Sequence, residues 1–123
     1  MKIHESGEMY LETILLLQKQ VKCVRAIDVA NSMEVTRAST SRALKQLKEM
    51  KLIVVDENGC ITFSKEGEQI AKSIYDRHVK LTQFFELIGI DSETASADAC
   101  KIEHVISDRS FEKIKQFIVL NSK

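Results

Sequence analysis

Two short β-rich runs, separated by Asn58-Gly59, constrain the fold of this chain more than any other feature. The runs cover residues 52–55 and 60–63. Asn-Gly between apolar runs is a strong hairpin signal, because a type I′ turn needs positive φ at both of its central positions. The sequence therefore predicts a β-hairpin here.

The segment before the hairpin has the outline of a helix-turn-helix. Residues 26–33 predict a short helix, and a break follows at Glu34-Val35. Thr36 is suited to cap a longer helix that runs to about residue 50. A short helix, a tight turn and a longer helix form this motif, and a hairpin directly after it is a wing. We therefore expect a winged helix-turn-helix DNA-binding domain in residues 1–63.

The remainder of the chain, residues 64–123, predicts a three-helix domain, which makes the protein mostly α. The expected helices cover residues 65–88, with Ser64 as the cap, then about 93–106 and 108–119. Three helices of this size cannot bury their apolar faces well. We expect a homodimer that covers these faces through the last helix and four further side chains: Phe84, Phe85, Leu87 and Ile88.

Composition narrows the class of protein further. The chain has 123 residues, of which 44% are hydrophobic and 29% charged. It has no apolar run of about 18 residues and no apolar signal core at its start, so we expect a cytoplasmic protein with no membrane partner. The three cysteines are scattered and include no CxxC pair. We therefore expect neither a disulfide framework nor a zinc ribbon.

A local basic segment points to nucleic acid, although the formal net charge of the chain is zero. Residues 36–48 carry four cations and no acid. On charge alone, a solvated helix face explains this segment equally well; together with the turn and the wing, DNA binding is favoured. The predicted contacts are Arg37, Ser39, Thr40, Ser41, Arg42, Lys45 and Lys48.

The segment DACKIEHVISD, residues 98–108, places three metal-ligand types at helical spacing. Cys100, Glu103 and His104 stand at i, i+3 and i+4, so on a helix they share one face. Taken alone, the segment is better explained by a helix with a buried cysteine and a solvated Glu-His edge.

Weaker signals of the same kind occur on two other predicted helices. Met9 and Glu12 stand at i and i+3 on a first helix predicted over residues 5–20, and His78 lies on the apolar stripe of the long helix predicted over residues 65–88. A core methionine, a surface glutamate and a core histidine explain these residues as well. Spacing alone does not bring the three helices together.

Several segments together resemble the diphtheria-toxin-repressor family of metal-dependent transcriptional repressors. They are EMYLETILLL near the start, the winged helix, the Arg-His pair at 77–78, LIGID at 87–91 and DACKIEHVISD. The similarity runs from about residue 8 to residue 118. The chain ends early, so it resembles the short two-domain branch without an SH3-like domain.

The resemblance implies a metal site. Positions of the iron-type main site correspond to Met9, Cys100, Glu103 and His104; those of the two-metal manganese-type core add Glu12 and His78. At two of these six positions, Met9 and Cys100 stand where the manganese branch has carboxylates. An ancillary iron-type site matches only at His78, because its other side-chain ligands fall on Thr82 and Ser96.

The chemical softness of the donor atoms then indicates which metal the site prefers. A thioether and a thiolate suit Fe(II) better than Mn(II), which prefers oxygen. We therefore expect Fe(II) as the cofactor and Mn(II) as second choice, in a homodimeric repressor of metal-homeostasis genes that binds palindromic double-stranded operator DNA.

Three alternatives stay open. One is a Mn(II)-responsive regulator of the same family. Another is a winged-helix regulator switched by oxidation of Cys100 or by a small molecule. The last is a metal-storage protein or metal-dependent enzyme, which we disfavour because the sequence has no separate base or nucleophile motif. We expect no enzymatic activity and no small organic substrate.

Overall fold

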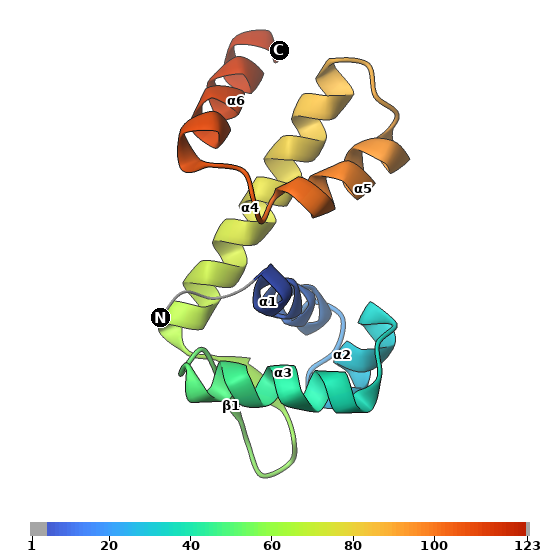
Figure 1. Ribbon diagram of the computed structural model, residues 1–123, viewed down its shortest axis with the longest axis vertical. Helices are drawn as coiled ribbons and strands as arrows, with labels where there is room; N and C mark the ends of the chain where they lie inside the picture. Colours follow the sequence, from blue (N-terminus) through green and yellow to red (C-terminus); the bar gives the residue numbers. More distant parts are fainter. Residues whose placement is uncertain (1–4, 123) are drawn as a thin grey trace. The chain divides into compact units, whose positions relative to one another are not determined.

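The computed structural model describes residues 5–122, and the chain divides into two compact units that join between Lys72 and Ser73 (Figure 1). The boundary lies within one long helix, α4 (Lys65–Leu87). The described residues form six helices and one two-stranded sheet, so the mostly α fold is confirmed.

The first unit contains the predicted helix-turn-helix. Helices α1 (Glu5–Gln18), α2 (Ala26–Met33) and α3 (Arg37–Glu49) pack on one another. Thr36 caps α3 as expected, since its hydroxyl accepts a hydrogen bond of 3.0 Å from the Ser39 amide. The turn before it is made by Glu34, which has a left-handed φ of 57°. The core of the three helices consists of Tyr10, Leu11, Ile14, Leu15, Val29, Ala30, Leu44 and Leu47.

The wing is present, but its turn differs from the prediction. Strands β1 (Ile53–Val55) and β2 (Ile61–Phe63) pair antiparallel. Gly59 has a φ of +82°, whereas Asn58 is not among the described residues with positive φ. The Asp56 carboxylate accepts hydrogen bonds from the amides of Asn58, at 2.8 Å, and Cys60, at 2.9 Å. The type I′ turn is therefore wrong, because Asp56 closes a three-residue loop that needs only one left-handed glycine.

The expectation that the cysteines form no disulfide is also wrong. Cys23, between α1 and α2, is bonded to Cys60, directly before β2, with a Cα–Cα distance of 5.0 Å. Next to this bridge the Ile61 amide donates a 2.7 Å hydrogen bond to the Val24 carbonyl. The hairpin folds back onto the segment before α2. This contact was not predicted, because the two cysteines are 37 residues apart in the sequence.

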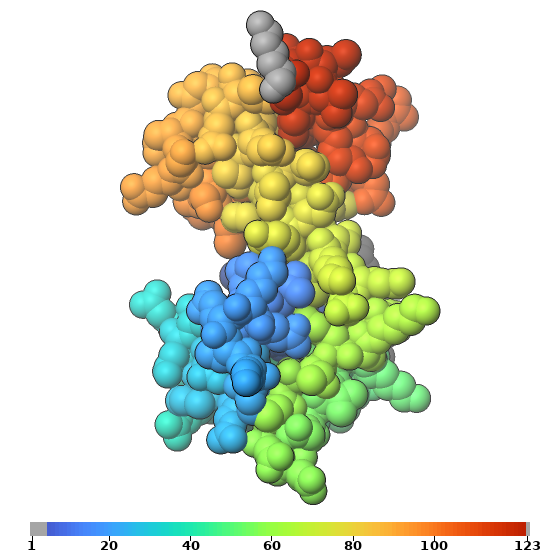
Figure 2. Space-filling model, turned by 180° about the vertical axis from the view of Figure 1, so that it is seen from behind, coloured from blue at the N-terminus to red at the C-terminus, as the bar shows by residue number. Residues whose placement is uncertain are grey.

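The second unit consists of the later part of α4 with α5 (Ser92–Ile102) and α6 (Asp108–Asn121). Figures 1 and 2 show α5 and α6 on either side of α4. The helices meet in a core of Leu81, Ala99 and Phe111. Gly89, with a φ of +101°, ends the long helix near the predicted position. None of the helices in the described range is long and apolar enough to span a bilayer.

Candidate metal centre and DNA-binding surface

Glu103 and His104 lie at the very end of α5, which is shorter than predicted. The helix ends at Ile102, and Glu103 is its C-cap residue. The helix was expected to continue to about residue 106. It stops because the chain turns there: the Val105 and Ile106 amides both donate to the Ile102 carbonyl, each at 3.0 Å.

Arg77, from α4, holds this turn in place. Its Nη1 donates to the carbonyl oxygens of Glu103, at 3.3 Å, and Ile106, at 2.6 Å. Its Nη2 binds the Asp108 carboxylate, and the guanidinium lies 5.3 Å from the centre of the Phe111 ring. No role was predicted for Arg77 from the sequence. The available signal was its position directly before His78 in the Arg-His pair.

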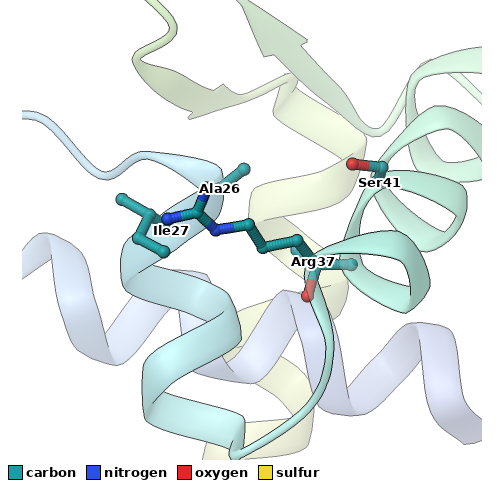
Figure 3. A pocket seen from close by; sticks show the side chains of 5 residues that line it. Ala26, Ile27, Arg37 and Ser41 are labelled. Atoms are coloured by element: carbon teal, nitrogen blue, oxygen red, sulfur yellow. The ribbon is translucent and has the colours of Figure 1, made fainter.

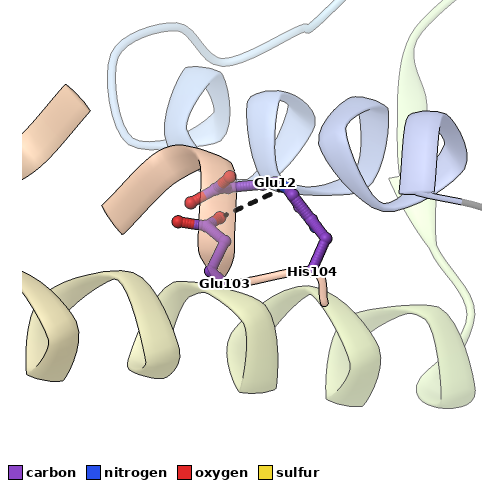
Figure 4. A group of neighbouring side chains, drawn as sticks. All are labelled: Glu12, Glu103 and His104. Atoms are coloured by element: carbon purple, nitrogen blue, oxygen red, sulfur yellow. Dashed lines mark ion pairs between the residues drawn. The ribbon is translucent and has the colours of Figure 1, made fainter. Parts of the chain in front are cut away.

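Glu103 stands between two imidazoles. Its Oε1 lies 2.8 Å from His78 Nδ1, and its Oε2 lies 3.5 Å from His104 Nε2, an ion pair that Figure 4 marks. The residue is only 1% exposed. Its Oε2 has no hydrogen-bond partner within residues 5–122. The structure thus brings together three of the predicted ligands, His78, Glu103 and His104.

This arrangement fits a divalent cation. A buried carboxylate is costly unless a partner compensates its charge, and a buried oxygen without a hydrogen bond usually has a specific reason. Carboxylate oxygen and imidazole nitrogen are ligands of first-row divalent metals. Glu103 with its two histidines therefore has the chemistry of a metal-binding group.

The other predicted ligands lie on α5 and α1. Cys100, in the last turn of α5, is half-buried and takes no part in the disulfide. On α1, Glu12 is 8% exposed and Met9 is 38% exposed. Met9 and Glu12 belong to the first unit. The ligand roles of all three side chains stay predictions.

The surroundings of His78 do not resemble an ancillary carboxylate site. Thr82 donates its hydroxyl to the His78 carbonyl at 2.7 Å, within α4. The Ser96 hydroxyl lies 3.4 Å from His78 Nε2. Hydroxyls thus occupy both positions, and the Thr82 hydroxyl already has a partner.

Helix α3 presents most of the predicted DNA contacts at its surface. Five side chains are exposed: Arg37, Ser41, Arg42, Lys45 and Lys48. Ser39 is half-buried and orients Arg42, whose Nη2 donates to its hydroxyl at 3.4 Å. The predicted DNA contact of Thr40 does not fit the structure, because Thr40 is 1% exposed and its hydroxyl donates to the Thr36 carbonyl at 3.0 Å. A buried, bonded Thr40 supports the helix and is not available to a base.

A pocket of about 310 Å³ opens between the start of α2 and the start of α3. Figure 3 shows the Arg37 side chain extending toward Ala26 and Ile27, with Ser41 nearby on α3. A guanidinium and a hydroxyl beside a helix N-terminus are groups that bind phosphate.

Comparison with known proteins identifies the family. Residues 2–60 match the family model described as "Iron dependent repressor, N-terminal DNA binding domain". Residues 64–119 match the model "Iron dependent repressor, metal binding and dimerisation domain". An uncharacterized HTH-type transcriptional regulator of Methanocaldococcus jannaschii is 30% identical over 116 residues, which cover 93% of each chain.

The chain belongs to the iron-dependent repressor family. It is thus a metal-dependent transcriptional repressor, as the resemblance to the diphtheria-toxin-repressor family predicted, and not an enzyme. The HTH-type transcriptional regulator MntR of Lysinibacillus sphaericus is 29% identical, over 92% of this chain and 81% of that protein.

Solved structures show the same fold. A manganese-dependent transcriptional repressor in complex with manganese has a TM-score of 0.84 and 24% identity, over 92% of this chain and 52% of that one. The manganese regulator SloR has a TM-score of 0.81 and 24% identity, over 92% and 53%. This chain therefore spans about half the length of both. The two solved structures are named for manganese and the family models for iron, so the comparisons do not support the expected preference for Fe(II).

Proposed function

We propose that this repressor acts in the cytoplasm as a homodimer and binds palindromic operator DNA of metal-homeostasis genes when a divalent metal is bound. Glu103 carries the proposal: it is a buried carboxylate between two imidazoles, and one of its oxygens has no hydrogen bond from the part of the chain that the structure describes. The proposed ligands are Met9, Glu12, His78, Cys100, Glu103 and His104.

Fe(II) is the proposed metal because of the two sulfur donors. Cys100 is half-buried one turn before Glu103, and Met9 is partly exposed on α1. Thiolate and thioether suit Fe(II) better than Mn(II).

Mn(II) is the second candidate, and a specific observation favours it. Glu103 lies within hydrogen-bond or ion-pair distance of His78 and of His104, and these three side chains offer only nitrogen and oxygen. A site restricted to these donors would suit Mn(II).

The proposed switch depends on ligands from both units. Met9 and Glu12 lie on α1, which packs against the helix-turn-helix, whereas the other four lie on α4 and at the end of α5. A metal held by both groups would restrict the motion of the DNA-binding unit. A metal shifts this equilibrium only if it binds the ordered state more tightly, and Met9 and Glu12 would supply that difference.

The two proposed functions belong to consecutive parts of the chain. We assign DNA binding to residues 1–63 and metal binding with dimerisation to residues 64–123. In a dimer, two α3 helices would meet half-sites about one helical turn, ~34 Å, or a multiple of it apart. Arg37, Ser41 and Arg42 would reach bases or phosphates, and Lys45 and Lys48 would contact the backbone.

The test begins with a duplex selected from a random-sequence library by the Fe(II)-loaded protein under anaerobic conditions. Its affinity is then measured with Fe(II), Mn(II), Co(II), Zn(II) and a chelator. We expect tight binding with metal and at least ~100-fold weaker binding with chelator, a change of about 2.7 kcal/mol. Equal affinity in the chelated sample would contradict the proposal.

A second arm tests the choice of metal. Cys100→Asp and Met9→Asp replace the sulfur donors by oxygen, so activation should move from Fe(II) toward Mn(II). Asp98→Asn, a change in the same helix at a residue outside the proposed ligands, is the control. An unchanged metal order in the two donor variants would show that neither sulfur binds the metal.

A further inference from the structure

We propose that Cys23 and Cys60 form a reversible thiol–disulfide switch that sets how firmly the wing is held and, through the wing, the affinity for DNA. The effect on DNA rests on the proposed function; the effect on the wing does not.

The disulfide is placed where the wing meets the helix-turn-helix. Cys23 precedes α2 by three residues, and Cys60 directly precedes β2. Beside the bridge, Val24 is 1% exposed and Ile61 is 2% exposed, and their backbones share the 2.7 Å hydrogen bond. The bridge thus ties the outer end of the wing to the segment that leads into α2.

The outer end of the wing has few other means of holding its position, whereas the base of the wing is fixed by the buried Leu52 and Ile53. Each strand has only three residues, and a two-stranded hairpin of this size is at best marginally stable by itself. Its outer face is open, with Val54 56% exposed. Breaking the bridge would leave this end of the wing attached by the Ile61–Val24 hydrogen bond and the packing of Ile61.

The local chemistry favours exchange at this disulfide. Both cysteines are half-buried, so they are not sealed from small thiols. The Arg25 Nε donates to the Cys23 sulfur at 3.5 Å. A guanidinium there stabilises Cys23 as a thiolate, which makes it the better leaving group, and attack by a reductant is directed to Cys60.

The reaction balances with a dithiol as reductant. A thiolate of the dithiol attacks the Cys60 sulfur, the Cys23–Cys60 bond breaks, and Cys23 leaves as a thiolate. The second thiol of the reductant then attacks the mixed disulfide and releases Cys60. Two electrons and two protons pass to the protein, and the dithiol becomes a disulfide.

The proposed location in the cytoplasm favours a reversible disulfide over a permanent structural one. In the cytoplasm, disulfides of most organisms are transient and serve catalysis or redox sensing. Because the bridge joins the wing to the helix-turn-helix, its cleavage acts on the part of the molecule that is proposed to meet DNA. The oxidised form is expected to bind more tightly, since its wing is ordered before binding.

The experiment equilibrates the full metal-loaded chain with mixtures of reduced and oxidised dithiothreitol. Isotope-coded alkylation and mass spectrometry report the state of each cysteine, and amide hydrogen exchange reports the wing. Reduction should speed exchange at residues 53–63 by at least ~10-fold, while exchange in α6 stays unchanged. Affinity for the selected duplex should fall about five- to tenfold.

Two variants distinguish the effect of disulfide exchange from a purely structural effect of the residues involved. Cys23→Ser/Cys60→Ser should show the exchange and affinity of the reduced wild type at every dithiol ratio. Arg25→Gln should retain the bridge and the oxidised exchange pattern but be reduced several-fold more slowly, an effect that a merely structural Arg25 would not produce.

Unchanged wing exchange on reduction would overturn the inference, as would a bridge that stays oxidised under all dithiol mixtures. Faster wing exchange with unchanged, metal-dependent DNA affinity would overturn the link to DNA. Faster wing exchange in a protein that binds DNA in neither redox state would support the wing switch and contradict the proposed function instead.

Discussion

Arg77 is the side chain that organises the end of α5, which carries proposed metal ligands, although Arg77 is not itself a proposed ligand. It binds the carbonyls of Glu103 and Ile106 and the Asp108 carboxylate. Residues behind the ligands fix their orientation, and their loss commonly lowers metal affinity 10- to 100-fold. Arg77 is therefore a positioning residue for Glu103 and His104.

We expect Arg77→Gln to lower metal affinity by at least ~10-fold, because the Glu103–Asp108 turn loses its anchor. Anaerobic titration calorimetry measures the affinity. Lys115→Gln is the control: Lys115 also lies over the Phe111 ring, at 5.0 Å, but its carboxylate partner is Glu112. Equal affinities in the two variants would show that Arg77 contributes only packing.

At the scale of the element, α5 begins at a carboxylate cap that is sensitive to pH. Asp91 accepts a 3.0 Å hydrogen bond from the Thr94 amide. This hydrogen bond holds the pKa of Asp91 below its usual value of 3.8. A lowered pKa means that the cap stabilises the fold above the usual value and that this contribution is lost as pH falls through the lower, folded value.

Acidification should therefore loosen the start of α5 only below the usual pKa of an aspartate. Carboxyl NMR titration should give Asp91 a pKa below that of an unfolded reference peptide. Asp91→Asn retains a cap acceptor but cannot titrate, so its stability should depend less on pH in the acid range. A carboxyl that titrates at or above the reference value would refute this account.

Helix α4 begins against the wing, and Gly67 allows the close approach. The Ser64 hydroxyl donates to the Leu52 carbonyl and accepts from the Gly67 amide, each at 3.1 Å. A Cβ at Gly67 would overlap the Leu52 carbonyl oxygen, which is backbone and cannot swing aside.

Gly67→Ala should therefore lower the free energy of unfolding, whereas helix propensity alone would raise it. At an open helical site, alanine stabilises by about 1 kcal/mol relative to glycine. Here we expect a net loss of about 1–3 kcal/mol from the forced shift of α4 against β1. Chemical denaturation measures the change, with Ser73→Ala, at an exposed position of the same helix, as the control. Stabilisation of the Gly67 variant would refute the clash.

The elements were largely predictable, for local reasons. Thr36 and Ser64 accept the cap hydrogen bonds that the sequence indicated. The turn type was not predictable from Asn58-Gly59 alone, because Asp56, two residues earlier, supplies the competing acceptor. The end of α5 was also missed, since the turn after it is held by Arg77, 26 residues before Glu103.

At the scale of the whole molecule, contacts between residues far apart in the sequence could not be predicted from local patterns. The disulfide joins residues 37 apart, and no local pattern marks Cys23 as the partner of Cys60. The candidate metal centre has the same character. Helical spacing linked Cys100, Glu103 and His104, but the position of His78 beside Glu103 follows from the packing of α5 on α4. The family resemblance supplied this connection before the structure did.

The second unit exposes an apolar set that matches the expected dimer face in part. Phe84 and Phe85 are half-buried within the unit, where Phe84 contacts Phe117 with ring centroids 5.5 Å apart. Apart from Val105, which precedes α6, the exposed large apolar side chains of the unit are Leu87, Ile88, Phe117, Val119 and Leu120. The dimer is therefore proposed to form through the exposed residues, with the two phenylalanines beneath them.

A charge placed in this set should disrupt the dimer. Leu120 is 82% exposed, so Leu120→Glu should leave the subunit folded and shift sedimentation toward the monomer, because a carboxylate would be desolvated at the interface. Val54→Glu, at an exposed position of the wing, is the control and should sediment like the wild type. A dimer that persists in the Leu120 variant would place the interface elsewhere.

The central claim is that a metal held by Glu103 activates DNA binding. The most direct test is the affinity for the selected duplex, with saturating Fe(II) and with chelator, in the wild type, Glu103→Gln and the exposed control Glu112→Gln. Glutamine keeps the shape of Glu103 but removes the charge. We predict at least ~100-fold activation by metal in the wild type and control and none in Glu103→Gln. Undiminished activation in Glu103→Gln would contradict the account.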